Sequence, residues 1–137
     1  MKNYRRRIMD TLLEKKLQAK GAVLIEGPKW CGKTTTAEEI ANSKIMLAKP
    51  DIKEHFKSLL EIDTDAALAG KTPMLIDEWQ TVPKLWDAVR YTVDHRHAMG
   101  QFILTGSAVP DKDAEKEREH SGTGRFAWLT MRTMTLY

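Results

Sequence analysis

Residues 27–34 read GPKWCGKT, and this stretch decides how the rest of the chain is interpreted. It matches the pattern G-x4-G-K-[ST] at every fixed position. The apolar run AVLIE at 22–26 comes directly before it, and KTTTAEEIAN, which favours a helix, begins at residue 33. Glycines allow the backbone to close around a phosphate, and the start of a helix presents N–H groups and a positive dipole end to it. The stretch therefore predicts a phosphate-binding loop between a buried strand and a helix.

The loop and the first turn of the helix contain the candidates for nucleotide binding. They are Gly27, Pro28, Lys29, Trp30, Cys31, Gly32, Lys33, Thr34 and Thr35. Lys33 is expected to reach the β- and γ-phosphates, and the Thr34 hydroxyl is expected to ligate Mg²⁺. The alternative is a chance match at an ordinary corner between a strand and a helix. The buried strand before the loop and the helix after it make that alternative the weaker one.

The stretch MLIDEWQ at 74–80 is a second motif, in which two acids follow an apolar run. Asp77, at the end of the predicted strand, suits a contact with Mg²⁺. Glu78 is then placed to polarise a water for attack on the γ-phosphate. A solvated strand end is the ordinary interpretation of an isolated Asp-Glu pair, but here the pair follows a phosphate loop, which favours the catalytic interpretation.

Short apolar runs alternate with helical patterns along the chain. Apolar residues at helical spacing predict an amphipathic helix over 4–19, and further helices are expected from 33, over 51–69 and between 83 and 100. Strands are expected at 22–26, 44–48, 73–78, 101–107 and 125–132. Residues 111–124 are highly charged and are expected to form a variable, solvated loop. The alternation predicts βαβ units, a parallel sheet and a three-layer α/β domain.

The ends of the predicted strands suggest further site residues. Ligands of open parallel sheets bind at the carboxyl ends of the strands. Thr105 or Ser107 is therefore a candidate sensor of the γ-phosphate or of the attacking water, with a plain turn as the alternative. Arg125 opens the last strand and is a candidate arginine finger, in cis or in trans from a neighbouring subunit. A structural salt bridge is the alternative for Arg125.

Composition limits the domain count, the compartment and the partners. For 137 residues, one domain spanning 1–137 is the natural expectation. The net charge of +3 is too small to indicate nucleic acid, so nucleic-acid binding is not supported. No apolar run approaches the roughly 20 residues of a membrane helix, so no membrane is expected. The single cysteine, Cys31, cannot form an internal disulfide, which favours a cytoplasmic domain.

Four stretches occur in a characteristic order: GAVLIEGPKWCGKTTTA, PMLIDEWQTVPKLWDAVR, GQFILTGSAVP and HSGTGRFAWLTMRTMTL. Together they resemble the N-terminal ATPase domain of a prokaryotic group of AAA-type ATP-binding proteins, over nearly the whole chain. The resemblance implies an AAA+-like P-loop NTPase that binds ATP rather than GTP, with a five-stranded sheet in the order 5-1-4-3-2. It also implies Walker B roles for Asp77 and Glu78. GTGRF is similar to the AAA+ box that carries the arginine finger, which points to Arg125.

Relatives that resemble this chain usually continue into a C-terminal region of unknown function. Because the sequence stops at Tyr137, we expect only the ATPase part, without a C-terminal lid or a sensor-2 arginine. Two function classes stay open: a Mg²⁺-dependent ATP hydrolase or switch, and a nucleotide-binding module with little or no turnover. A P-loop kinase is less favoured because Glu78 beside Asp77 suits water as the nucleophile, and a GTPase because no N-K-x-D motif occurs. Assembly into a homo-oligomer also stays open.

Overall fold

The computed structural model describes residues 2–27, 33–106 and 125–130, without the side chains of 2–7, 33–35 and 130. The helices in that part are α1 (Lys2–Ala19), α2 (Lys33–Ile40), α3 (Pro50–Ile62), α4 (Thr64–Ala67) and α5 (Lys84–Arg96), with a 3-10 turn, η1 (Trp79–Thr81). The strands are β1 (Ala22–Glu26), β2 (Ser43–Met46), β3 (Met74–Asp77), β4 (Phe102–Gly106) and β5 (Phe126–Thr130). All five expected strands are therefore present, each shifted by no more than a few residues.

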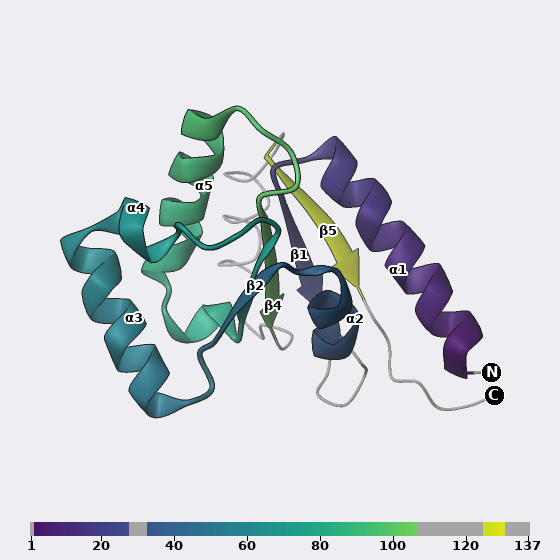
Figure 1. Ribbon diagram of the computed structural model, residues 1–137, viewed down its shortest axis with the longest axis horizontal. Helices are drawn as coiled ribbons and strands as arrows, with labels where there is room; N and C mark the ends of the chain where they lie inside the picture. Colours follow the sequence, from purple (N-terminus) through teal and green to yellow (C-terminus); the bar gives the residue numbers. More distant parts are fainter. Residues whose placement is uncertain (1, 28–32, 107–124, 131–137) are drawn as a thin grey trace, which may run out of the picture.

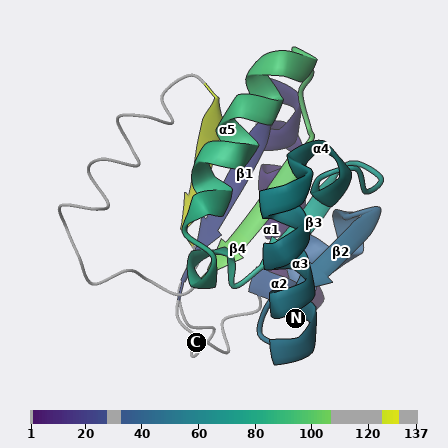
Figure 2. The same ribbon diagram turned by 90° about the vertical axis from the view of Figure 1, so that its left-hand side faces the viewer.

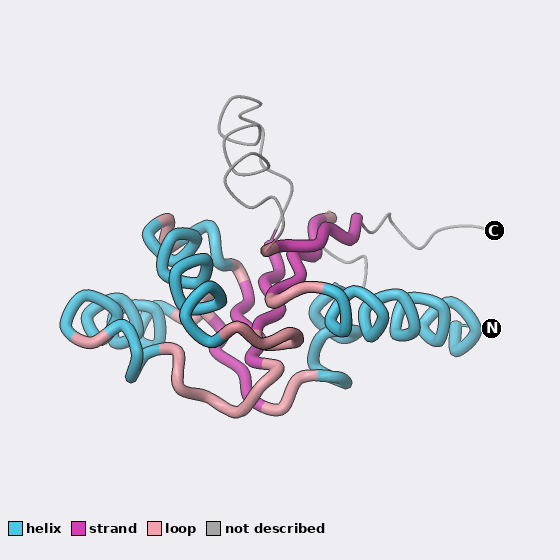
Figure 3. The backbone as a smooth tube through the Cα atoms, turned by 90° about the horizontal axis from the view of Figure 1, so that it is seen from above, coloured by secondary structure: helices cyan, strands magenta, loops and turns pink. Residues whose placement is uncertain are grey.

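The five strands form one sheet in the order β2-β3-β4-β1-β5, and every neighbouring pair is parallel. From the opposite side this is the order 5-1-4-3-2, so the expected topology is confirmed. Helices cover both faces of the sheet (Figure 3). α1 and α2 lie on one face, whereas α3, α4 and α5 lie on the other (Figures 1 and 2). The three-layer α/β fold is thus confirmed.

Each face of the sheet buries its own apolar core. Successive side chains of a strand point to opposite faces, so a strand contributes alternately to the two cores. In β1, Leu24 packs toward α3 and α5, whereas Val23 and Ile25 pack in the cluster with Leu13 of α1 and Ala37 of α2. Because both faces are covered, the strands read as continuous apolar runs rather than alternating ones. This burial makes β1, β3 and β4 clear in the sequence, whereas the edge strand β2 is only partly buried.

Two expected helix boundaries were wrong, and both errors have a local cause. The single helix expected over 51–69 is two helices, because Asp63 has an extended backbone (φ −150°) and ends α3. The Asp63 side chain then accepts a hydrogen bond from the backbone N–H of Ala66 over 3.1 Å and so caps α4. The helix expected to run to residue 100 ends at Arg96, since His97 adopts a left-handed conformation (φ 51°).

An aromatic cluster connects the turn after β3 with α5 and β5. The Trp86 ring of α5 stacks on Phe126 of β5, with 4.1 Å between the ring centroids. The Trp86 ring centroid also lies 5.4 Å from that of Trp79 and 6.1 Å from that of Trp128. Trp86 is 6% exposed and Trp79 is 4% exposed. The cluster therefore anchors the turn that follows Asp77 to the core under α5.

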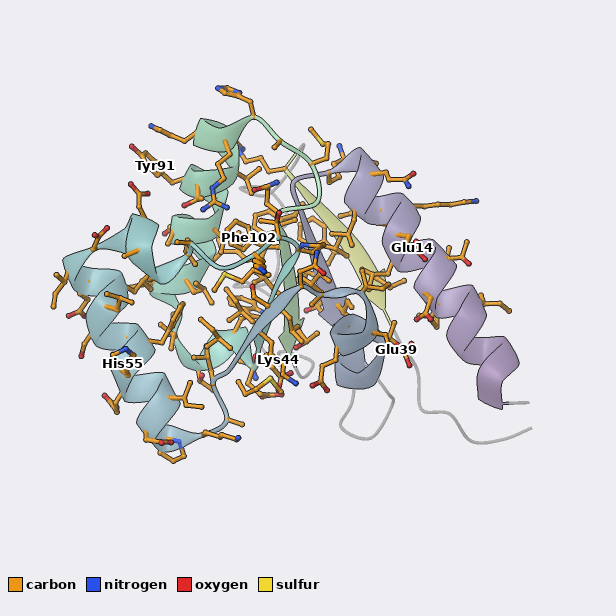
Figure 4. The ribbon with its side chains drawn as sticks, viewed as in Figure 1. Glu14, Glu39, Lys44, His55, Tyr91 and Phe102 are labelled. Atoms are coloured by element: carbon orange, nitrogen blue, oxygen red, sulfur yellow. The ribbon has the colours of Figure 1, made fainter. Side chains whose placement is uncertain are left out.

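We expect Trp86→Ala to lower the free energy of unfolding by about 3–5 kcal/mol, because it removes a buried ring and leaves a cavity. Tyr91→Ala on the same helix is the matched control. Tyr91 is 59% exposed and points away from the sheet, whereas Phe102 lies at its centre (Figure 4), so the control should change stability by less than about 1 kcal/mol. Urea unfolding followed by circular dichroism measures both. Equal midpoints for the two variants would contradict the assigned core.

Candidate functional site

The ends of β1, β3 and β4 meet at one edge of the sheet, which we call the carboxyl edge. Asp77, the last residue of β3, pairs in register with Thr105 of β4, and Thr105 pairs with Ile25 of β1. Gly27 follows β1 directly and is buried. At this edge, only β4 separates the predicted Walker B aspartate on β3 from the start of the predicted phosphate loop after β1.

Asp77 and Thr105 contact each other at this edge. The Thr105 hydroxyl donates a hydrogen bond to Asp77 Oδ1 over 2.5 Å. Asp77 is 7% exposed and Thr105 is fully buried. Asp77 lies two residues after Leu75, and Thr105 two residues after Ile103, so both share the face on which α2 packs. A buried carboxyl group thus faces the side of the sheet on which α2, the helix after the predicted phosphate loop, begins.

The helix expected to follow the predicted phosphate loop begins where the sequence predicted. α2 starts at Lys33, and its body contacts β3 and β4. Lys33, Thr34 and Thr35 form its first turn, but their side chains are outside the described part of the chain. The other candidates that lie outside the described residues are Pro28, Lys29, Trp30, Cys31, Gly32 and Ser107. The roles assigned to these residues stay predictions.

Glu78 leaves the sheet in an unusual backbone conformation. Its φ of 57° and ψ of 45° are left-handed, which is uncommon for a residue with a side chain. The turn is held by Thr81, whose backbone N–H and hydroxyl both donate to the Glu78 carbonyl, over 3.1 Å and 2.9 Å. The conformation is therefore fixed by the turn that follows. Side chains held in such strained positions are concentrated at functional sites.

Two residues that sequence reasoning did not single out belong to the same edge. Gln80 donates from Nε2 to Glu78 Oε2 over 2.8 Å. Gly106 ends β4 and packs so closely on Gln80 and Trp79 that a Cβ there would lie 2.4 Å from Gln80 Oε1. The sequences Trp79-Gln80 and Thr105-Gly106-Ser107 show no periodic pattern that would predict this contact. It depends on the left-handed backbone conformation of Glu78, which a glutamate does not indicate in the sequence.

Arg125 lies at the opposite edge of the sheet. Its backbone carbonyl accepts a hydrogen bond from Ala22 N–H, at the start of β1, over 3.2 Å. Its Nε donates to Asp94 Oδ1 of α5 over 2.5 Å, and both side chains are partly exposed. At about 3.3 Å per residue, the length of β1 puts roughly 15 Å between the two edges. The fold does not bring Arg125 to the carboxyl edge, so this position does not fit a finger in cis, and the salt bridge considered as the alternative is present.

The hollow beside Arg125 is also remote from the predicted phosphate loop. It has a volume of about 310 Å³ and is lined by Gly21, Val93, Asp94, His97, Ala98, Met99 and Arg125. These residues surround the amino ends of β1 and β5, whereas nucleotides bind at the carboxyl ends of parallel strands. We therefore do not assign the hollow to the nucleotide.

The carboxyl edge offers the oxygen ligands that Mg²⁺ prefers. In phosphate sites, Mg²⁺ is usually held by one or two carboxylates together with substrate phosphates, not by a full protein cage. Asp77 supplies such a carboxylate on the α2 face, and its contact with Thr105 orients it. Within the described ranges, no group of three or more His, Cys, Asp or Glu side chains gathers around a common point. The residues present thus fit a magnesium ion that is shared with a nucleotide.

The chain matches one family model and two curated proteins. A family model described as an AAA domain matches residues 19–137. Over 107 residues the chain is 31% identical to an uncharacterized protein of Mycobacterium bovis, and it is equally identical to one of Mycobacterium tuberculosis. Each alignment covers 77% of this chain but 24% of the relative, so the chain spans about a quarter of their length.

A solved structure of C. elegans PCH-2 is similar with a TM-score of 0.47 and 15% sequence identity, over 96% of this chain and 43% of that one. In the described part of the chain, no helix combines the length and the apolar character needed to cross a bilayer.

Proposed function

Because this chain belongs to the AAA domain family, whose P-loop NTPase domains bind nucleotide, we propose that it binds Mg²⁺·ATP at the carboxyl edge and hydrolyses it. The observation that carries the proposal is the buried Asp77–Thr105 pair, which shares one face of the sheet with the first turn of α2. We propose that residues 1–137 act as one ATPase domain.

In this proposal each residue at the edge has a defined part. The backbone of residues 27–35 wraps the phosphates, and Lys33 contacts the β- and γ-phosphates. Thr34 and Asp77 hold Mg²⁺, which neutralises phosphate charge when it is bound. Glu78 accepts a proton from a water whose oxygen attacks the γ-phosphorus, while the bond to the β–γ bridging oxygen breaks and ADP leaves. Thr105 orients Asp77 through the observed hydrogen bond.

Steady-state release of phosphate from ATP tests the proposal. The full chain should release phosphate with Mg²⁺, and chelation by EDTA should stop the release. Mg²⁺·GTP should be a poorer substrate, as the resemblance to ATP-binding relatives implies. Saturable ATP binding without phosphate release would instead support the alternative, a nucleotide-binding module without turnover. Release only in the presence of a small-molecule phosphoacceptor would support a kinase.

The position of Arg125 predicts that any role as a finger is exerted in trans. Arg125→Ala should lower kcat by at least about 10-fold and leave KM for ATP unchanged, because a finger acts on charge that develops in the transition state. The specific activity of the unaltered chain should then rise with protein concentration. Analytical ultracentrifugation at the same concentrations measures the assembly.

Asp94→Asn is the matched control for Arg125→Ala, since it removes the charge of the salt-bridge partner and keeps the arginine. That salt bridge is partly exposed, at 36% for Arg125 and 45% for Asp94, so its own contribution to stability should be small. Asp94→Asn should therefore leave kcat nearly unchanged. Equal losses in the two variants would show that the salt bridge, and not a finger, explains Arg125.

A further inference from the structure

The side chain of Gln80 is bonded at one end and unpaired at the other. Its Nε2 donates to Glu78 Oε2 over 2.8 Å. Its Oε1 is buried and accepts no hydrogen bond among the residues that the structure describes. An ionised carboxylate can only accept, so the NH₂ group of the amide must face Glu78 and the amide oxygen must face away from it. The unpaired oxygen is therefore a consequence of the bond to Glu78.

Gly106 makes room for this amide. A Cβ at Gly106 would lie 2.4 Å from Gln80 Oε1 and 3.1 Å from Trp79 Nε1. Gly106 ends β4 and pairs in register with Glu26, the residue before the predicted phosphate loop. The amide of Gln80 thus fills the space between the end of β4 and the carboxylate of Glu78, at the carboxyl edge itself.

Fold stability does not account for a glutamine at this position. A buried acceptor without a donor costs about as much free energy as a hydrogen bond to a charged group contributes. The two ends of the Gln80 side chain therefore nearly cancel. An apolar side chain of similar length would fill the same space without the unpaired oxygen. The specific contribution of the amide is therefore its hydrogen bond to the Glu78 carboxylate.

We propose that Gln80 is a positioning residue, whose amide holds the Glu78 carboxylate in the orientation from which it accepts the proton of the attacking water. This inference rests on the hydrolysis proposed above. Thr81 fixes the backbone of Glu78 through its two hydrogen bonds to the carbonyl. Gln80 fixes the side chain. Together they leave the carboxylate little freedom to turn away from the nucleotide.

Gln80→Met tests the proposal, because methionine has a similar length and neither donates to Glu78 nor carries an amide oxygen. We expect kcat for phosphate release to fall by about 10- to 100-fold, with KM for ATP unchanged, since only the base is misplaced. The thermal midpoint should stay the same or rise, because the unpaired oxygen is also removed. Gln101→Met is the matched control: Gln101 is half-buried before β4 at the other edge and bonds to Arg96 and to the Met99 carbonyl. It should leave kcat unchanged.

Gly106→Ala gives a second, independent variant. The nearest atom is the flexible end of Gln80, and the Trp79 ring at 3.1 Å would have to shift only slightly, so the fold should survive while the amide is displaced from Glu78. The expected loss in kcat is similar to that of Gln80→Met. Gly70→Ala is its control, since the Cβ there would lie 2.5 Å from Ser43 Oγ at the amino end of β2, remote from Glu78. That variant should keep its kcat.

The outcomes separate this inference from the proposed function. If the unaltered chain releases no phosphate, the proposed function and the role of Gln80 both fail. If it releases phosphate and Gln80→Met is as active, only the role of Gln80 fails. A loss of kcat that is accompanied by a lower thermal midpoint or a higher KM would assign Gln80 a structural role instead. In a Glu78→Gln background, Gln80→Met should cost nothing further, because the base that it positions is already absent.

Discussion

Lys33→Ala is expected to weaken ATP binding by at least about 100-fold, because the β- and γ-phosphates lose their charged hydrogen-bond donor. Lys33 is the first residue of α2, at the side of the sheet that Asp77 and Thr105 face. Isothermal titration calorimetry with Mg²⁺·ATP measures the change directly. The fold should be unaffected, since a helix start carries alanine as well as lysine.

Lys57→Ala is the control for Lys33→Ala, because Lys57 is exposed on α3 at the other face of the sheet. It removes the same charge and should leave the dissociation constant unchanged. Unaltered affinity in Lys33→Ala would remove the assignment of residues 27–34 as a phosphate loop. Equal weakening in both variants would instead indicate an unspecific effect of net charge.

Glu78→Gln is expected to lower phosphate release by about 10³-fold while ATP affinity is kept, because an amide cannot accept the proton of the attacking water. The substitution is nearly isosteric. Glutamine at this position can still accept the hydrogen bond from Gln80, so the turn after β3 should persist. Phosphate release and equilibrium binding, measured on the same sample, separate the loss of chemistry from a loss of binding.

Glu54→Gln provides the matched control, since Glu54 is exposed on α3 and neutralising it should change neither quantity. Unchanged turnover in Glu78→Gln would count directly against Glu78 as the base. A parallel loss of affinity and turnover would show that the variant disturbs the turn, and in that case its kinetics would say nothing about proton transfer.

The inner strands β1, β3 and β4 were predictable from the sequence because they are buried on both faces. AVLIE became β1 without a shift, and the five-strand parallel order followed from the family resemblance. The helix boundaries near Asp63 and His97 were not predictable in the same way. They depend on one extended and one left-handed residue inside sequences that otherwise favour a helix. Local backbone choices of this kind are decided by caps and tertiary contacts rather than by periodicity.

Some residues of the candidate site were likewise predictable from the sequence, and others were not. The positions of Asp77 and Thr105 were predictable because each lies at the end of an apolar run, and parallel strands bring their carboxyl ends together. Arg125 was predicted to open the last strand, and it comes directly before β5; because β5 pairs in parallel with β1, that position puts it at the amino end of the sheet. Gln80 was missed because its bond to Glu78 requires a left-handed turn at a residue that seldom adopts one.

The proposed reaction is the transfer of the γ-phosphoryl group of ATP to water. Single-turnover hydrolysis of γ-labelled ATP, with protein in excess, tests it most directly, because slow release of ADP cannot then hide the chemical step. We expect labelled inorganic phosphate in the presence of Mg²⁺, none after chelation, and release slowed by about 10³-fold in Glu78→Gln. Labelled ATP that stays bound and intact in the unaltered chain with Mg²⁺ would contradict hydrolysis and leave a domain that only binds nucleotide.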